Sequence, residues 1–178
     1  MIYLSAGHWN GDPGAVANGL QENELTKQLR DAIAAELRAL GATFTLDKDT
    51  EPLAAYLARI KPGSGSVVCE VHFNAASPAA TGIEVITADN PTPDSKALAA
   101  DLASSGARLM GIVNRGVKTE AQSHRVRLGL MRKPAGITVL PEVCFITNPG
   151  DIRSFFANIK NLAREWARLL YLYDGKHV

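Results

Sequence analysis

Three ionisable residues lie after, or at the end of, short apolar runs in this sequence. His8 follows the run Ile2–Ser5, His72 ends a second run, and Glu142 lies near the end of a third. In open α/β sheets, ligands bind beyond the carboxyl ends of the strands, so side chains at these positions can meet in one site. A lone histidine is most often a core or surface residue. Two histidines and a carboxylate at equivalent positions favour a functional site.

A predicted helix over Glu22–Leu40 supplies a further carboxylate. At 100° per residue, Glu22 projects onto the middle of the apolar stripe of this helix, whereas Glu24 lies roughly opposite and is interpreted as a solvent-exposed charge. A carboxylate on the core-facing side must be paired or bound to something. The alternative for Glu22 is an N-terminal carboxylate stabilised by the helix dipole by about 0.3–1 kcal/mol. The stripe consists of Leu25, Leu29, Ile33, Leu37 and Leu40.

Two histidines and one carboxylate, here His8, Glu22 and His72, form a ligand set that suits zinc with a fourth position open for water. Zinc lowers the pKa of its bound water to about 7, which gives a nucleophile at neutral pH. A second carboxylate that is not a ligand is then needed as general base, and Glu142 is the candidate. The predicted chemistry is metal-assisted hydrolysis of an amide or ester.

The elements that must position these residues alternate along the chain. We expect strands at Ile2–Ser5, Ala42–Leu46, Ser66–His72, Gly82–Thr87 and Ile137–Val143, the last near the sheet centre, and helices at Glu22–Leu40, Glu51–Ile60 and from Pro93 to about Val113. A last helix carries Phe156, Ile159, Ala163, Trp166, Leu170 and Tyr173 at spacings of three and four, and Lys118–His124 is a predicted loop. This alternation predicts an α/β fold, a mostly parallel (mixed) twisted sheet with helices on both faces.

Length and charge exclude several classes of protein. The 178 residues correspond to one domain, which we place over residues 1–178. Nineteen Lys and Arg against 18 Asp and Glu give a net charge of +1 without a basic run, so a nucleic-acid partner is not expected. The apolar runs are too short to span a bilayer, and no signal peptide is evident. Cys69 and Cys144 are interpreted as buried thiols, with one disulfide between them left open.

Several stretches resemble, in order, the zinc-dependent N-acetylmuramoyl-L-alanine amidases of the type 3 fold. They are Gly7-His8-Trp9-Asn10-Gly11-Asp12-Pro13-Gly14-Ala15, Asn18-Gly19-Leu20-Gln21-Glu22, Val71-His72-Phe73-Asn74-Ala75 and Pro141-Glu142-Val143-Cys144-Phe145-Ile146-Thr147-Asn148, supported by Gly82-Ile83-Glu84-Val85 and Asn114-Arg115-Gly116-Val117-Lys118. Each motif alone is weak, whereas the ordered set spans nearly the whole chain and is specific.

The resemblance implies a phosphorylase/hydrolase-like fold and a hydrolase that cuts the amide between N-acetylmuramic acid and L-alanine in peptidoglycan. It implies one zinc ion per chain on His8, Glu22 and His72, with Glu142 as the catalytic glutamate. Asn74 falls on a position that orients the site. Asp12 and Gly14 look like residues that shape the loop after His8.

Two further residues are candidates for the site because of where they lie in the sequence, independently of the resemblance. Glu70 shares strand parity with His72, so it is either a hydrogen-bond partner of that imidazole or part of a surface ion pair. Trp9 is expected either to stack on substrate at the site rim or simply to cover the loop.

The sequence also departs from the family pattern. An arginine that the family often carries after its second strand is absent from Thr45-Leu46-Asp47-Lys48-Asp49, and the stretch from Arg59 to Ser66 is abridged. These departures concern substrate contacts on that side of the site.

The biological setting follows from the resemblance and from the missing signal peptide. We expect a monomeric catalytic domain without a separate cell-wall-binding domain and without membrane insertion. Its expected role is that of a phage endolysin, held in the cytoplasm until it is released to the peptidoglycan. A cell-encoded lytic amidase is the nearby alternative. A zinc peptidase acting within the stem peptide, or a catalytically silent peptidoglycan-binding module, are the alternatives for the activity.

Overall fold

Six strands form the main sheet of the computed structural model, which describes residues 1–123, 128–132 and 136–175. The strands are β1 (Ile2–Ala6), β4 (Phe44–Leu46), β5 (Val67–Asn74), β6 (Ile83–Thr87), β7 (Asn114–Thr119) and β8 (Ile137–Phe145), in the spatial order β4-β1-β5-β8-β6-β7. The first four in this order run parallel, whereas β6 is antiparallel to β8 and parallel to β7. The predicted mixed, mostly parallel sheet is confirmed, with β8 in its interior.

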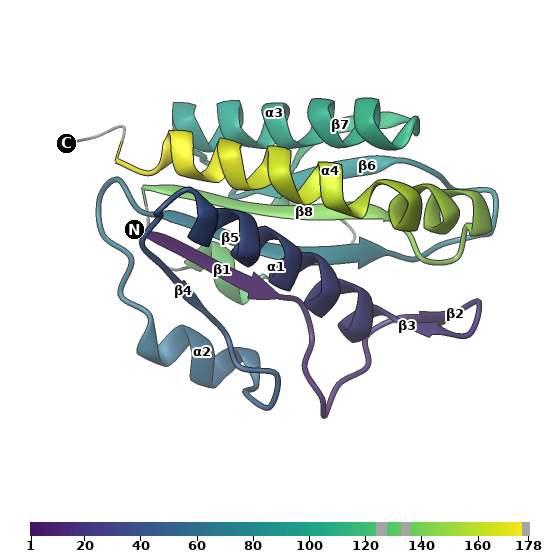
Figure 1. The fold of residues 1–178 in the computed structure, drawn as a ribbon, viewed down its shortest axis with the longest axis horizontal. Helices are drawn as coiled ribbons and strands as arrows, with labels where there is room; N and C mark the ends of the chain where they lie inside the picture. Colours follow the sequence, from purple (N-terminus) through teal and green to yellow (C-terminus); the bar gives the residue numbers. More distant parts are fainter. Residues whose placement is uncertain (124–127, 133–135, 176–178) are drawn as a thin grey trace.

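The two faces of the sheet are covered unequally. Three long helices, α1 (Glu22–Ala39), α3 (Pro93–Met110) and α4 (Pro149–Tyr173), lie together over one face (Figure 1). The other face carries the short helix α2 (Leu53–Arg59) and the 3-10 turn η2 (Gly129–Arg132), and a further 3-10 turn, η1 (Glu120–Gln122), follows β7. Helices therefore lie on both faces, as predicted, but the second face is thinly covered.

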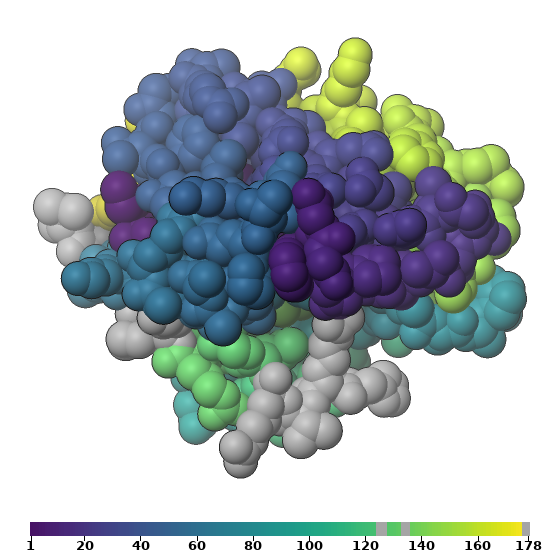
Figure 2. All heavy atoms as spheres, turned by 90° about the horizontal axis from the view of Figure 1, so that it is seen from below, coloured from purple at the N-terminus to yellow at the C-terminus, as the bar shows by residue number. Residues whose placement is uncertain are grey.

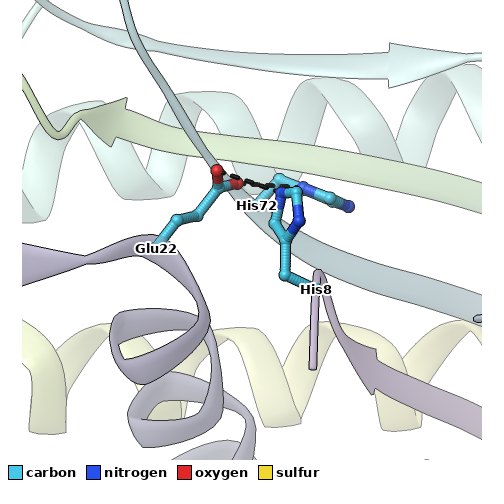
Figure 3. Close-up of side chains that lie close together, drawn as sticks. All are labelled: His8, Glu22 and His72. Carbon is cyan, nitrogen blue, oxygen red and sulfur yellow. Dashed lines mark hydrogen bonds and ion pairs between the residues drawn. The ribbon is translucent and has the colours of Figure 1, made fainter. Parts of the chain in front are cut away.

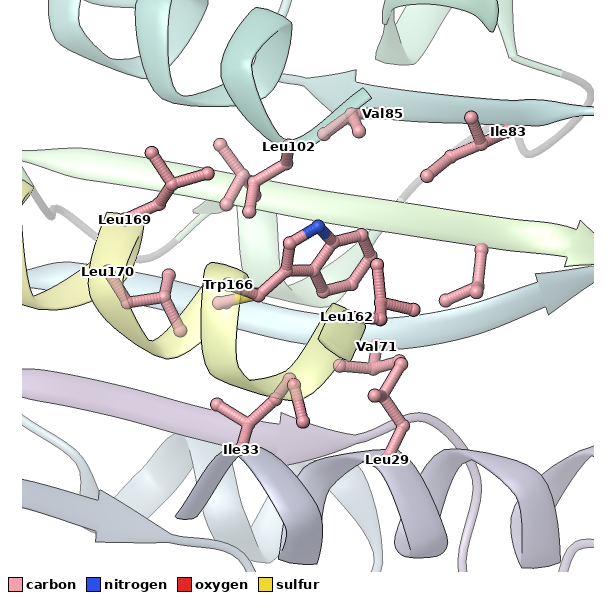
Figure 4. Packing of buried hydrophobic residues seen from close by; sticks show 14 of the residues in the cluster. Leu29, Ile33, Val71, Ile83, Val85, Leu102, Leu162, Trp166, Leu169 and Leu170 are labelled. Atoms are coloured by element: carbon pink, nitrogen blue, oxygen red, sulfur yellow. The ribbon is translucent and has the colours of Figure 1, made fainter. Parts of the chain in front are cut away.

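Because side chains alternate along each strand, the core is divided into a large cluster on one face of the sheet and smaller clusters on the other. Ile2 and Leu4 belong to the large cluster beneath the long helices, whereas Tyr3, between them, packs against Tyr56 of α2. The buried indole of Trp166 on α4 lies at the centre of the large cluster, between residues of α1, α3 and the sheet (Figure 4). The predicted stripe of α4 is confirmed except at Phe156, which is 43% exposed while its neighbour Phe155 is buried.

Two pieces of β structure were not predicted. Strands β2 (Val16–Ala17) and β3 (Leu20–Gln21) form a hairpin whose turn residues Asn18 and Gly19 both have positive φ. This conformation is typical of the Asn-Gly turn, a signal that the sequence carries. Strand β7 begins where the third helix was expected to end, and its last two residues lie in the predicted loop Lys118–His124. His124 itself lies outside the described residues.

Helix ends differ from the predictions by a few residues. α3 stops at Met110 because Gly111 adopts a left-handed conformation, with φ of 64°, that caps the helix. α1 ends at Ala39, and Leu40, which was placed on its apolar stripe, is the C-cap and is 41% exposed. α2 begins after Pro52, two residues later than expected.

The described helices include none that is both long and apolar enough to cross a membrane. Cys69 and Cys144 are both buried and unbonded. Cys69 pairs in register with Val139, five residues before Cys144, so the two cysteines lie roughly 15 Å apart along the strand direction. A disulfide needs Cα atoms within about 7 Å, which excludes the bridge that the sequence left open.

Candidate metal centre

Three residues from three elements converge at the carboxyl edge of the parallel strands. His8 follows β1, His72 lies on β5, and Glu22 is the first residue of α1 (Figure 3). One ligand atom from each residue lies within 4.8 Å of the other two, and all three residues are buried or half-buried. The convergence of these candidates matches the spacing that a single bound metal ion requires.

Glu22 holds the centre of this group. Its Oε1 lies 3.0 Å from His72 Nδ1 and accepts the Phe73 N–H at 3.0 Å, while its Oε2 lies 3.1 Å from His8 Nε2. Burial opposes ionisation of this carboxyl, but the two histidines outweigh it and hold the pKa of Glu22 well below its usual range. Glu22 is 1% exposed whereas Glu24 is exposed, as the helix periodicity predicts.

Each histidine ring is held from the outside by another carboxylate. His8 Nδ1 lies 2.8 Å from Asp12 Oδ2, and His72 Nε2 lies 3.1 Å from Glu70 Oε1. Protons on these outer nitrogens would leave the lone pairs of His8 Nε2 and His72 Nδ1 facing Glu22. Of the two readings for Glu70, the imidazole partner is therefore the one that the geometry supports.

The surroundings of the three side chains fit a metal ion. His8 Nε2 is buried and lies 3.1 Å from Glu22 Oε2, and it has no other polar partner in the part of the chain that is described. Burial lowers the pKa of both histidines, but the carboxylates nearby, Glu22 foremost, raise it above the ordinary value. A proton or a cation is therefore favoured at this place, and two imidazoles with a carboxylate are a zinc-type donor set.

The backbone is shaped to bring the ligands together. His8 has a positive φ of 66°, which is uncommon for a residue other than glycine and turns its side chain back toward Glu22. A Cβ on Gly14, whose φ is +65°, would come within 2.7 Å of His8 Nε2 and of Glu22 Oε2. A Cβ on Gly7 would collide with the His72 ring. Both glycines are therefore required by the close packing of the ligand side chains.

Glu142 lies beside the group but outside it. On β8 it pairs in register with His72 of β5, so the two side chains point to the same, thinly covered face on strands about 5 Å apart. Its side chain is 2% exposed, and its charge contributes to the raised pKa of His72. A carboxylate next to the ligands, but not among them, is in a position to exchange protons with a bound substrate.

The predicted orienting residue Asn74 does not touch the ligands directly. Its Nδ2 donates to Glu84 Oε1 at 3.0 Å, and Glu84 Oε2 accepts from Arg115 Nε at 2.8 Å. Glu84 pairs in register with Glu142, so this chain of contacts continues the polar row away from His72. Sequence reasoning assigned no role to Glu84 or Arg115. A charged residue within the apolar strand Gly82–Thr87 was the signal that could have identified Glu84.

A pocket of about 370 Å³ opens beside the two histidines, on the side away from Glu142 and Glu84 and toward α2. Trp9 and Asp12, from the loop after His8, are among the residues that line it. Figure 2 shows this face, with the purple N-terminal loop beside the blue α2 segment and green residues of η2 below them. Tyr56 and Asp47 also line the pocket and were not singled out in the sequence. Asp47 comes from the segment that departs from the family pattern.

The segment 45–49, which departs from the family pattern, forms ion pairs with α1. Asp47 and Asp49 accept from Arg30 of α1 at 3.1 and 2.7 Å, and Asp47 also accepts the Ala6 N–H. Burial raises the pKa of Asp47 even though Arg30 opposes that effect. The cluster anchors the wall of the pocket to α1.

Comparison of the sequence with known proteins identifies one family. The family model described as N-acetylmuramoyl-L-alanine amidase matches residues 2–164. The amidase LytC of Bacillus subtilis is 28% identical over 155 residues, which cover 84% of this chain and 30% of LytC. This chain thus spans less than a third of that relative.

Solved structures share the fold. An N-acetylmuramoyl-L-alanine amidase from Clostridium difficile superimposes with a TM-score of 0.83 at 22% identity, over 98% of this chain and 97% of that one. The catalytic domain of the CD27L endolysin, which targets the same organism, has a TM-score of 0.74 at 18% identity, over 95% of both chains.

Proposed function

Because this chain belongs to the N-acetylmuramoyl-L-alanine amidase family, we propose that it uses zinc to hydrolyse the amide between N-acetylmuramic acid and L-alanine in peptidoglycan. The observation that carries this proposal is the group formed by His8, Glu22 and His72 with Glu142 beside it on the same face. These residue types at this spacing suit metal-assisted amide hydrolysis.

His8, Glu22 and His72 would hold the zinc ion, and zinc bound there would supply Lewis-acid activation of a water molecule and of the amide carbonyl. Asp12 and Glu70 fix the two imidazole rings through their outer nitrogens, so both ligand nitrogens stay directed at Glu22. The buried setting keeps competing water away from the carboxylates and strengthens their effect.

Glu142 is the proposed general base and proton shuttle. Its carboxylate would take a proton from the attacking water and deliver it to the amide nitrogen, so that L-alanine leaves as an amine. Its place on the interior strand β8 holds the side chain in a fixed position relative to His72. Trp9, on the rim of the pocket, would contact the substrate through its indole.

Two alternatives keep part of this arrangement. A zinc peptidase acting within the stem peptide would need the same ligands and the same glutamate, and it differs only in where the substrate lies. A silent binding module would have no use for a buried carboxylate beside the ligands, and Glu142 therefore favours an enzyme.

For the biological role we propose lysis of the cell wall by a phage enzyme, supported by the motif resemblance and by the likeness of the fold to the catalytic domain of the CD27L endolysin. A bacterial lytic amidase is the alternative, and the identity to LytC favours it to a similar degree.

The substitution Glu142→Gln tests the proposed mechanism. We expect it to keep bound zinc at one ion per chain and to reduce release of soluble fragments from peptidoglycan by at least about a hundredfold, since general acid–base catalysis contributes about 10²–10⁴-fold. Glu165→Gln, on the surface of α4 and far from the site, is the matched control and should retain activity. Unchanged hydrolysis by Glu142→Gln would remove Glu142 from the mechanism.

A further inference from the structure

Arg115 is a surface arginine whose guanidinium is nevertheless held in place. Its Nε donates to Glu84 Oε2 at 2.8 Å, and its guanidinium lies 5.1 Å from the centre of the Phe145 ring. Glu84 is itself fixed by the amide of Asn74. The described part of the chain offers no partner to the two Nη groups of Arg115, and the side chain is 39% exposed. Four N–H donors are thus available to a ligand.

The backbone around Arg115 is built to aim this side chain. The pairing of β6 with β7 shifts register between Ile83 and Val85, which makes a bulge opposite Glu84. Gly116 has a φ of +79°, and its N–H donates to Asn114 Oδ1 at 2.8 Å, which fixes the bulge. A Cβ on Gly82 would come within 3.0 Å of Arg115 Cγ and Cδ. Bulges commonly redirect a side chain next to an active site.

Arg115 lies on the same face of the sheet as the metal centre, at the end of a row of polar side chains. Glu84 pairs with Glu142, and Glu142 pairs with His72, so all three side chains share one face on neighbouring strands. With strands about 5 Å apart, Glu84 lies two strands, or about 10 Å, from His72. Arg115 extends this row beyond Glu142, on the side opposite to the pocket that α2 covers. A distance of about 10 Å corresponds to about three residues of extended peptide.

We propose that Arg115 binds a carboxylate of the peptidoglycan stem peptide, close to the bond that is cut. This inference rests on the proposed function and adds to it the side of the metal centre on which the stem peptide lies. A carboxylate on the stem residue that follows L-alanine would lie within that reach. A planar guanidinium whose Nε is occupied by Glu84 presents its Nη groups to such a carboxylate. The muramic acid would then lie toward Trp9 and the pocket.

A pair of substrates tests this assignment without any mutation. Two soluble muropeptides are compared, one with a free carboxylate on the second stem residue and one with a carboxamide there. We expect the zinc-loaded wild-type enzyme to cleave the carboxylate form with a kcat/KM about tenfold to a hundredfold higher, mainly through KM, since hydrogen bonds to charged groups contribute about 1.5–3 kcal/mol. Equal kcat/KM for the two substrates would overturn the proposal.

The substitution Arg115→Gln then assigns the preference to this residue. Glutamine can still donate to Glu84, so the local fold is kept, but the charge is lost. We expect the preference for the carboxylate form to fall to about twofold or less. Arg38→Gln is the matched control, because Arg38 also lies over an aromatic ring, that of Phe44, yet on the far end of α1. If Arg115→Gln lowers the cleavage of both substrates equally, Arg115 has no role in recognising the carboxylate.

Failure of the proposed activity would give a different pattern. If the wild-type enzyme cuts neither muropeptide, the amidase proposal is wrong, and the two free stem peptides are instead titrated into the wild-type and Arg115→Gln proteins. Tighter binding of the carboxylate peptide to the wild-type protein alone would still support the Arg115 site. Equal binding of the two peptides would overturn it.

Discussion

Glu70 and Asp12 perform the same task in very different surroundings. Both accept a hydrogen bond from the outer nitrogen of a candidate zinc ligand, but the Glu70 side chain is 4% exposed and that of Asp12 is 51% exposed. Glu70 is also fixed from its other oxygen by Ser5 Oγ at 3.2 Å. Water can reach the exposed Asp12 contact more easily than the buried contact between His72 and Glu70. On the side away from Glu22, the His72 ring is therefore held by one buried carboxylate.

The substitution Glu70→Gln should weaken zinc binding about tenfold to a hundredfold, the usual effect of removing a carboxylate that orients a ligating histidine. Competition with a chromophoric zinc indicator measures the affinity. Asp12→Asn is the matched variant and should have a smaller effect because its site is open to solvent. Zinc affinity of Glu70→Gln equal to that of the wild type would show that His72 is positioned without Glu70.

The grouping of His8, Glu22 and His72, the candidate ligands, could be predicted because each position follows from a local rule. His8 and His72 stand at strand ends, and the helix periodicity separates Glu22 from Glu24. The contacts of Glu84 and Arg115 could not be predicted, since they depend on the register of β6 against β7 and on a bulge between them. Register across strands distant in sequence leaves no local signal of this kind.

At the level of elements, the first turn of α4 is attached to the sheet by one buried side chain. Asp151 accepts hydrogen bonds from Thr81 Oγ1 at 2.6 Å and from the Gly82 and Phe145 N–H groups at 3.0 Å each. Asn148 caps the same turn through the Gly150 and Asp151 N–H groups. These contacts join α4 to the end of β8 and to the start of β6, the two strands that carry Glu142 and Glu84.

Replacing Asp151 by Ala should destabilise the fold by at least about 1–3 kcal/mol, because the buried N–H groups of Gly82 and Phe145 then lose their acceptor. Urea denaturation followed by circular dichroism measures the free energy of unfolding. Glu165→Gln, which removes a partly exposed ion pair with Arg168 on the same helix, should change it by less than about 1 kcal/mol. A loss no larger than that of Glu165→Gln would contradict the role given to Asp151.

Elements with helical periodicity or an apolar run were predicted, whereas a two-residue hairpin and a polar edge strand were not. The spacing of apolar residues located α1 and α4, and the Thr92-Pro93 start located α3. The buried faces of the three helices contribute to one core over the sheet. The β2–β3 hairpin has only two residues in each strand, so no alternation can be read from them, and its Asn-Gly turn was the only indication. β7 is polar and lies at the sheet edge, and its sequence Asn-Arg-Gly-Val-Lys-Thr lacks an apolar alternation.

For the whole molecule, the unequal covering of the sheet explains where the site lies. Three long helices cover one face, and the polar row from His72 through Glu142 to Glu84 lies on the other. Only α2 and η2 cover part of that face, and the pocket lies between them and the histidines. An extended polymer such as a peptidoglycan strand can approach a face of this kind. The sequence predicted helices on both faces but could not show how unevenly they are divided.

The most direct test of the central proposal is digestion of purified peptidoglycan before and after removal of metal with a chelator, followed by mass analysis of the soluble products. We predict free stem peptides that begin with L-alanine, absent after chelation and restored when zinc is added back. Shortened peptides still joined to muramic acid would contradict the amidase assignment, and digestion that is unaffected by the chelator would contradict the zinc site.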